Sequence, residues 1–437
     1  MFETLKQAFK VKEIRVKIWF TILFLIIYRI GCYIPVPGVA TGSMLDMSNS
    51  LSYLNIMNMM TGGSLANGTF FAMGIGPYIN ASIIMQLLSV AIPSLERLSK
   101  QGEEGRKRIA QYTRYITIVL AIIQSLGIIL NYGDAIWSPE GATGLHELLF
   151  GQKWLAVTVL VLFYTAGTVV TMWIGERITE YGISNGISLL IFAGIIATAG
   201  LAFIDMIRNI SGDNGLINFW KLVAFLISII AVFVCIVTVD LAERKIPVQY
   251  AKQIKGNKMY GGQSTVIPIK VNSNGVLPLI FAFSIISFPE LIMTLFGWAD
   301  SSFGLWWAKY MGTQSWVYIV VLCLLIVFFA YFYTSIQFNA DDISKSIQQN
   351  GGFIMGIRPG KPTAEYLKKI SGRITLFGAI FLALLALVPS IIFQAIDPTT
   401  SSAFTATGML IVVSVAMELN TALESQIMMK NYKGFLK

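Results

Sequence analysis

The sequence predicts an all-α polytopic membrane protein with ten transmembrane helices. Of its 437 residues, 55% are hydrophobic and only 13% are charged, and the mean hydropathy is +0.68. A soluble core cannot bury so large an apolar share. Ten apolar segments also have the length needed to cross a bilayer, about 17 to 25 residues each. These observations together assign the chain to the multi-pass membrane class.

The ten predicted spans follow one another with charged or Gly- and Pro-rich stretches between them. They cover residues 18–34, 74–93, 115–131, 153–174, 184–204, 217–239, 275–296, 315–335, 374–395 and 403–421. A short apolar half-segment, too short to cross a bilayer, precedes the second span.

Lysine and arginine positions set the predicted orientation. With the N-terminus in the cytoplasm, 27 of the 32 basic residues fall on the cytoplasmic side. Arg29 lies within the first span, and four others, Lys153, Arg208, Lys221 and Lys309, lie on the far side. Basic residues favour cytoplasmic loops, so both termini are predicted there and the net charge of +9 mostly reports topology.

Ten spans divide into two sets of five, and an odd number places two such halves in opposite orientations. That is the geometry of an inverted repeat around a central pore; the inference rests on count and topology, because the halves show no convincing self-similarity. The predicted organisation is a cytoplasmic amphipathic segment 1–17, an N-terminal half 18–210, a C-terminal half 211–421 with cytoplasmic loops 240–274 and 336–373, and a cytoplasmic tail 422–437.

The second span is unusual because Gly74, Gly76, Pro77 and Asn80 lie near its entry. With the half-segment at roughly 52–67 it predicts a broken helix. Irregular backbone at membrane depth is tolerated only where protein or a water-filled cavity surrounds it. The segment is therefore predicted to line an aqueous path.

Ionisable residues are scarce within the spans, where Arg29, Glu290 and Glu418 all lie near ends. His146 is the only histidine, which nearly excludes histidine-based metal sites and catalytic dyads. No enzyme activity and no cofactor are predicted. An ion-coupled secondary transporter shares the broken helix and inverted repeat and stays open as the alternative, although it would need ion-coordinating residues at the midplane.

Two long motifs carry a family resemblance. TFFAMGIGPYINASIIMQLL at 69–88 and WIGERITEYGISNGISLL at 173–190 resemble the two signatures of the SecY family, the channel subunits of the bacterial Sec protein translocase. AERKIPVQYA at 242–251, GGQSTVIPIKVN at 261–272 and GIRPGKPT at 356–363 resemble its cytoplasmic loops. The resemblance implies a channel that passes unfolded preproteins across the plasma membrane and releases transmembrane segments sideways into lipid.

The resemblance also implies a pore ring of six isoleucines: Ile75, Ile79, Ile187, Ile191, Ile280 and Ile411. The residues are compatible with this role, because isoleucines at i and i+4 share one helix face. β-branched side chains are stiff, so such a collar would be firm and free of donors or charges. Packing against lipid or core is the alternative for each isoleucine alone.

The half-segment would be the plug that closes the channel from outside, with residues Tyr53, Leu54, Asn55, Ile56, Met57, Met60, Gly62 and Gly63. A cap that never moves is the alternative.

Gln86, Gln124 and Asn272 would form a lateral-gate cluster, or else be three independent amides, and Asn274 departs from the small apolar residue expected there. Amide pairs across membrane helices contribute only about 1 kcal/mol, which suits a gate.

Arg244, Lys245 and Arg358 resemble the loop-tip residues through which the family engages the SecA motor and the ribosome. Arginine suits bidentate contacts with carboxylate or rRNA phosphate, while solvated loop charge is the alternative for any single lysine. The implied partners are SecE, SecG, SecA, the ribosome, signal peptides and nascent chains, and the phospholipid bilayer.

Overall fold

The structure is a computed structural model of the 437-residue chain. It describes residues 2–37, 39, 57–131, 153–208, 210, 215–250, 253–255, 258–260, 264–272, 275, 277–296, 298, 301–312, 315–396 and 406–435.

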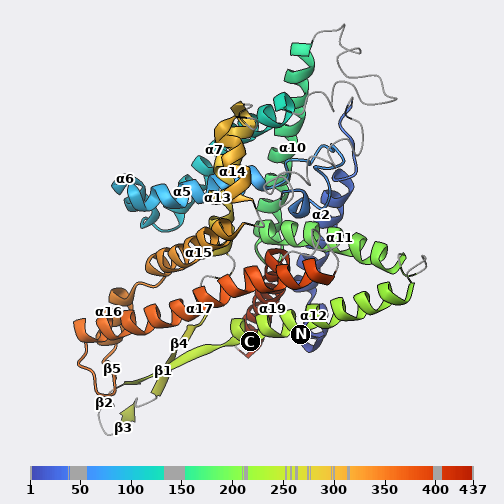
Figure 1. The fold of residues 1–437 in the computed structure, drawn as a ribbon. Helices are drawn as coiled ribbons and strands as arrows, with labels where there is room; N and C mark the ends of the chain where they lie inside the picture. The colour runs from blue at the N-terminus through green and yellow to red at the C-terminus, as the bar shows by residue number, and fades with distance from the viewer. Residues whose placement is uncertain are drawn as a thin grey trace.

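Helices dominate the described residues, and Figure 1 shows how they are arranged. The N-terminal half holds α1 (Phe2–Lys10), α2 (Lys12–Gly31), α5 (Gly76–Ala91), α6 (Pro93–Ser99), α7 (Glu103–Asn131), α10 (Lys153–Tyr181) and α11 (Gly186–Arg208). The C-terminal half holds α12 (Gly215–Leu241), α13 (Leu277–Phe296), α14 (Ser302–Met311), α15 (Trp316–Gln337), α16 (Ala340–Gln349), α17 (Lys361–Ile396) and α19 (Ala406–Phe435).

Each of the ten predicted spans coincides with a helix of this all-α membrane fold. Seven of the described helices are long and apolar enough to cross a bilayer, and an eighth is added if α5 and α6 form one bent span. The other two are α2 and α13. α2 carries Lys17, Arg29 and further charges. Within α13, the apolar stretch Leu277–Glu290 is too short to be counted as a span. The count of ten therefore stays a prediction.

The predicted break ahead of the second span is present. Residues 61–75 form turns, and α5 begins only at Gly76, with Pro77 in its first turn. A second break was not predicted: α5 and α6 meet at an angle of 106° around Ile92. Pro93 explains this bend, because a proline disfavours helical backbone in the residue before it. Ile92 accordingly has extended backbone.

Helices extend beyond several predicted limits. α17 begins at Lys361, so the last part of the predicted loop 336–373 is helical, and α19 continues through most of the predicted tail to Phe435. α14 lies between the seventh and eighth spans, where no element was predicted. Ser301 caps it by accepting a hydrogen bond from the Gly304 N–H, a start signal that the sequence contains.

The hydrophobic core divides into clusters that broadly follow the two halves. One joins residues of the N-terminal half around α7 and α10. A second is built from α12, α13, α15, α17 and α19, with Ile83 of α5 as its one buried member from the N-terminal half. A third packs α2, α10 and α11 against Ile411 and Val415 of α19. The halves therefore meet along α5 and α19.

The two predicted cytoplasmic loops form one sheet. β1 (Glu243–Tyr250) pairs antiparallel with β4 (Ser264–Lys270), and β5 (Gly352–Ile354) pairs with the other edge of β1, giving the order β4-β1-β5. β2 (Gln253–Lys255) and β3 (Lys258–Tyr260) form a separate hairpin. Segments about a hundred residues apart in sequence are thus hydrogen-bonded, and the loops are structured, as predicted.

A small core holds this sheet to the helices beneath it. Ile246 and Val248 of β1, Ile354 of β5, Ile347 of α16 and Leu367 of α17 are all buried in it. Figure 1 shows the sheet beside α16 at the edge of the molecule, away from α10. α1 lies beside the last part of α19, where Ala8, Leu423 and Ile427 share another core cluster.

Truncating the buried leucine of the sheet's core should loosen the region around the sheet β4-β1-β5. Leu367 is fully buried, and Leu→Ala at such a site costs about 2 to 5 kcal/mol. We expect Leu367→Ala to increase limited proteolysis between residues 240 and 360. Leu376 lies on the same helix and is 44% exposed, so Leu376→Ala is the control. Equal cleavage of both variants would contradict this packing.

Candidate functional site

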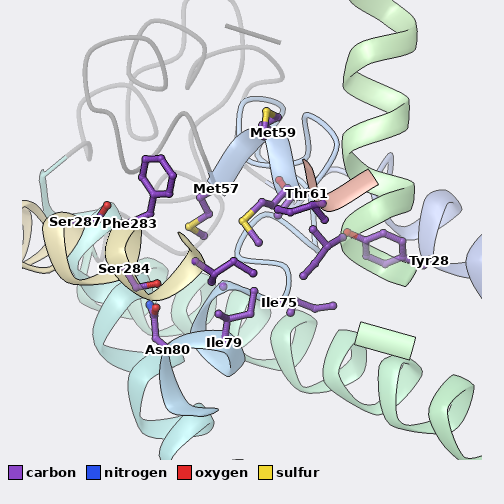
Figure 2. Close-up of a pocket in the computed structure, with 15 residues that line it drawn as sticks. Tyr28, Met57, Met59, Thr61, Ile75, Ile79, Asn80, Phe283, Ser284 and Ser287 are labelled. Carbon is purple, nitrogen blue, oxygen red and sulfur yellow. The ribbon is translucent and has the colours of Figure 1, made fainter. Parts of the chain in front are cut away.

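A cavity lies where the C-terminal core cluster meets the cluster formed by α2, α10, α11 and α19. Its lining includes five of the six predicted ring residues: Ile75, Ile79, Ile191, Ile280 and Ile411. They come from the start of α5, from α11, from α13 and from α19. Figure 2 shows Ile75 and Ile79 on this cavity together with residues of α13 and of the half-segment. The fold therefore gathers side chains that are more than 300 residues apart in sequence.

The sixth isoleucine, Ile187, does not line this cavity. It packs against the cluster that contains Ile75, Ile191 and Ile411, beside Gly175 of α10. Ile79 packs against both this cluster and the C-terminal cluster, and Ile280 packs against the latter. The ring residues therefore occupy the seam between the two halves.

The inner part of the predicted plug closes one side of the cavity. Met57, Met59, Met60 and Thr61 all line it, and the side chains of Met57 and Met59 are 4% and 3% exposed. Of the other predicted plug residues, Gly62 and Gly63 form the following turn, whereas Tyr53, Leu54, Asn55 and Ile56 lie outside the described residues. The described part is well packed in this state.

Hydrogen bonds within this segment satisfy its irregular backbone. The Asn58 side chain accepts from the Ala66 N–H at 2.9 Å, and the Asn58 carbonyl accepts from the Gly63 N–H at 2.9 Å. Ser64 Oγ donates to the Thr61 carbonyl at 2.9 Å, and Thr69 Oγ1 donates to the Ser64 carbonyl at 3.1 Å. Buried polar backbone requires such partners, and Asn58 supplies two of them within the segment.

Glycines let this segment approach α11 closely. A methyl group at Gly194 would overlap the Met60 carbonyl oxygen. Gly62, whose φ of +71° favours glycine, lies against the same point of α11 and against the Arg29 guanidinium of α2. Arg29 Nη2 donates to the Tyr33 hydroxyl at 3.4 Å, while its buried Nη1 has no hydrogen-bond partner in the described structure. The predicted first-span arginine thus contacts the plug.

The cavity wall is mostly apolar, and among the described residues that line it only Tyr28 has an ionisable side chain, a phenol. Its other polar groups are uncharged ones such as Asn80, Ser284 and Ser287. A wall of this kind places no charged side chain beside the cavity. It can close by aliphatic contact and exclude water and ions by dewetting.

The three predicted gate amides are not joined to one another by any hydrogen bond found in the described residues. The Oε1 atoms of Gln86 and Gln124 are buried without a partner. Asn272 is only 9% exposed, and its Nδ2 donates to Asp240 Oδ1 at 2.7 Å. The predicted cluster is thus two unsatisfied amides on α5 and α7 and one amide tied to α12.

The predicted docking residues are all exposed, on the sheet β4-β1-β5 or beside it. Arg244 and Lys245 lie at the start of β1, where Lys245 Nζ is 3.1 Å from Glu243 Oε1. Arg358 lies in a turn between Gly356 and Gly360, both with positive φ. Its carbonyl accepts from Thr363 Oγ1 at 2.8 Å, and the Gly360 carbonyl accepts from Ser344 Oγ at 2.7 Å. The turn therefore holds Arg358 outward on a firm base.

Comparison with known proteins decides the family. The SecY family model matches residues 69–420. The chain belongs to the SecY family. Proteins named protein translocase subunit SecY from Streptomyces galbus and from Corynebacterium glutamicum are 40% and 42% identical to it, with at least 99% of both chains covered in each case.

Solved structures agree with this fold. A structure described as a protein-conducting channel matches with a TM-score of 0.66 and 20% identity, covering 94% of this chain and 91% of that one. The Sec61 of a canine ribosome–channel complex from the endoplasmic reticulum matches with a TM-score of 0.62 and 18% identity, over the same shares.

Membership fixes the general function. The chain is a multi-pass plasma-membrane protein and the protein-conducting channel subunit of a translocase, and it is not an enzyme. The predicted fold class, function and family are confirmed in these terms. Nothing in the relatives favours the ion-coupled transporter.

Sequence reasoning missed three residues that shape the site. Tyr28 lines the cavity, Asn58 accepts hydrogen bonds within the predicted plug, and Asp240 accepts one from Asn272. Asn58 and Tyr28 carry no distinguishing local signal. Asp240 did carry one, because it is an acidic residue at the end of a long apolar segment, but it was assigned to the loop.

Adding one methyl group at Gly194 should displace the plug. Gly194→Ala would force the Met60 carbonyl away from α11, and we expect Met57→Cys in that background to react at least about tenfold faster with a water-soluble maleimide, as for a segment that loses protection through local opening. Gly200→Ala is the control, since Gly200 is on the same helix with open space around it. Equal maleimide reaction rates in the Gly194→Ala and Gly200→Ala backgrounds would contradict this close packing of Met60 against α11.

Proposed function

We propose that the cavity is the closed translocation pore, with the six isoleucines as its constriction and the segment at roughly 52–67 as its plug. The observation that carries this proposal is the shared cavity of five predicted ring isoleucines and two predicted plug methionines, Met57 and Met60. These residues were chosen by motif alone, and four separate helical elements and the half-segment bring them together.

The chemistry of the wall supports closure without selectivity for sequence. An aliphatic collar makes no hydrogen bonds, so it can close around any extended polypeptide while resisting ions. Methionine side chains adapt to irregular surfaces, and the hydrogen bonds within the plug would be kept if the plug moved. The plug could therefore leave as a unit when a chain enters, whereas a fixed cap would stay in place.

Lateral release would occur between α5 and α7 on one side and α13 on the other. α7 packs directly against α13, and Gln86 and Gln124 each present an unsatisfied buried oxygen there. Amides in the helices that border such a seam would add little stability to its closed state. A signal peptide or apolar segment could therefore separate the helices at modest cost.

We infer that both termini, the sheet β4-β1-β5 and the Arg358 turn face the cytoplasm. The distribution of basic residues supports this orientation, as does the packing of α1 beside α19. The cytoplasmic partners would be the SecA motor and the ribosome, docking through Arg244, Lys245 and Arg358. SecE and SecG would accompany the chain in the membrane, and nascent chains and signal peptides would be its substrates.

Opening the proposed constriction should make the channel leak. We expect Ile79→Gly, Ile187→Gly and Ile191→Gly together to raise the ion conductance of the reconstituted complex at least about tenfold, because the hydrophobic barrier is lost. The control replaces Ile196, Ile204 and Ile207 of α11, each about half exposed, with the same glycines. Conductance equal to that of the control would remove these residues from the constriction.

Direct contact with substrate tests the proposed path itself. A photo-crosslinking residue at position 79 should form adducts with an arrested secretory chain, because Ile79 lines the cavity. The same probe at position 196 should crosslink to lipid instead. Adducts of equal yield at both positions would place the chain outside this cavity.

Reversing the charge at Arg358 should weaken motor docking. We expect Arg358→Glu to reduce SecA-driven export about tenfold, as for loss of one charge-assisted contact, while the channel still inserts and assembles. Lys345→Glu makes the same charge change at an exposed residue of α16. Export that is equally reduced by Lys345→Glu would indicate a general electrostatic effect.

A further inference from the structure

Asp240 joins the last turn of α12 to the connection that leads into α13. Its Oδ1 accepts a 2.7 Å hydrogen bond from Asn272 Nδ2. Asn272 is buried, with 9% of its surface exposed. Lys270, at the end of β4, also acts electrostatically on this carboxylate. A charge-assisted bond at such a site is stronger than a neutral one.

A backbone hydrogen bond lies beside the Asp240–Asn272 pair. The Val271 N–H donates to the Ala242 carbonyl at 2.9 Å, directly beyond the last register pair of the β1 and β4 hairpin, Glu243 with Lys270. The base of the hairpin is therefore held twice, once through its backbone and once through Asp240. The two bonds together tie the end of β4 and Asn272 to the end of α12.

The connection is also held from the side of α17. A methyl group at Gly378 would lie 2.6 Å from the Val271 carbonyl oxygen, so the two backbones approach closely. α13 begins at Leu277, five residues after Asn272, and carries Ile280 in its first turn. Asn272 therefore lies in the short connection just before the helix that carries Ile280.

We propose that Asp240 is a positioning residue that couples the cytoplasmic sheet to α13 through Asn272, holding the seam closed in the idle channel. The inference rests on the proposed function, because it takes α13 as the moving side of the gate. A docked partner that draws the β1 and β4 hairpin away from α12 would break this bond. α13 would then be free to move from α5 and α7.

The geometry gives Asp240 partners on two sides. Its observed hydrogen bond goes to Asn272 in the connection, and the Ser414 hydroxyl of α19 also lies within its reach. An amide donor and a carboxylate acceptor can also be exchanged between the two positions with the same shape. The pair can therefore be tested by reversal as well as by removal.

The test measures the separation of α5 and α13 by disulfide formation. Asn80 and Ser284 line the same cavity, and Figure 2 shows their side chains pointing toward one another. In the reconstituted complex, with Cys32, Cys235 and Cys323 replaced by alanine, Asn80→Cys and Ser284→Cys report the closed seam. The rate of disulfide formation and the idle ion conductance are both recorded.

We expect Asp240→Ala to slow disulfide formation and to raise idle conductance by about tenfold, the shift for a two-state gate that loses one such bond. Asp240→Asn keeps the shape with a weaker neutral bond and should have a smaller effect. The exchanged pair, Asp240→Asn with Asn272→Asp, should restore both values to within about twofold of the parent. Glu243→Gln, which removes an exposed charge from the same hairpin, is the control.

Each outcome decides a separate question. If the exchanged pair behaves no better than Asn272→Asp alone, or if Asp240→Ala resembles Glu243→Gln, the coupling role is wrong. Should Asp240→Ala fail to assemble, Asp240→Asn and the exchanged pair still give the comparison. The Asp240 variants could behave as expected while the variant with glycine at positions 79, 187 and 191 does not leak. That result would support the coupling role and contradict the proposed constriction.

Discussion

The structure depends on satisfying irregular backbone at the centre of an apolar protein. Residues 61–75 form turns where a continuous helix would bond its own N–H and C=O groups, and unpaired groups there would cost several kcal/mol each. Asn58, Ser64 and Thr69 supply the missing partners, and Gly194 lets α11 come close. The surrounding helices then need only enclose a segment that is already satisfied.

Patterns of short range were readable from the sequence. The spans follow from apolar length, the break before α5 from its glycines and Pro77, and the shared face of Ile75 and Ile79 from their spacing. The basic loops were expected to be structured because they alternate turn residues with short apolar runs. What joined distant ring residues was motif resemblance, since no local signal relates Ile79 to Ile411.

Features that depend on long-range pairing were not readable. Nothing local indicates that β5 adds to β1, since the strand has three residues and its partner lies about a hundred residues earlier. The roles of Arg29 and Asp240 arise from which segment packs beside them, against Gly62 in one case and Asn272 in the other. The observed ends of α17 and α19 also differ from the predicted limits, because both helices make further contacts beyond their predicted spans.

The position of the isoleucines on the seam between two core clusters has an energetic consequence. Ile79 contacts both clusters, so separating the halves removes contacts between them while each cluster keeps its own. The aliphatic area uncovered in this way is of the same kind as the area that an incoming polypeptide covers with its own side chains. In the proposed pore, opening would then exchange similar surfaces, and its free energy would depend little on the sequence of the polypeptide that passes through.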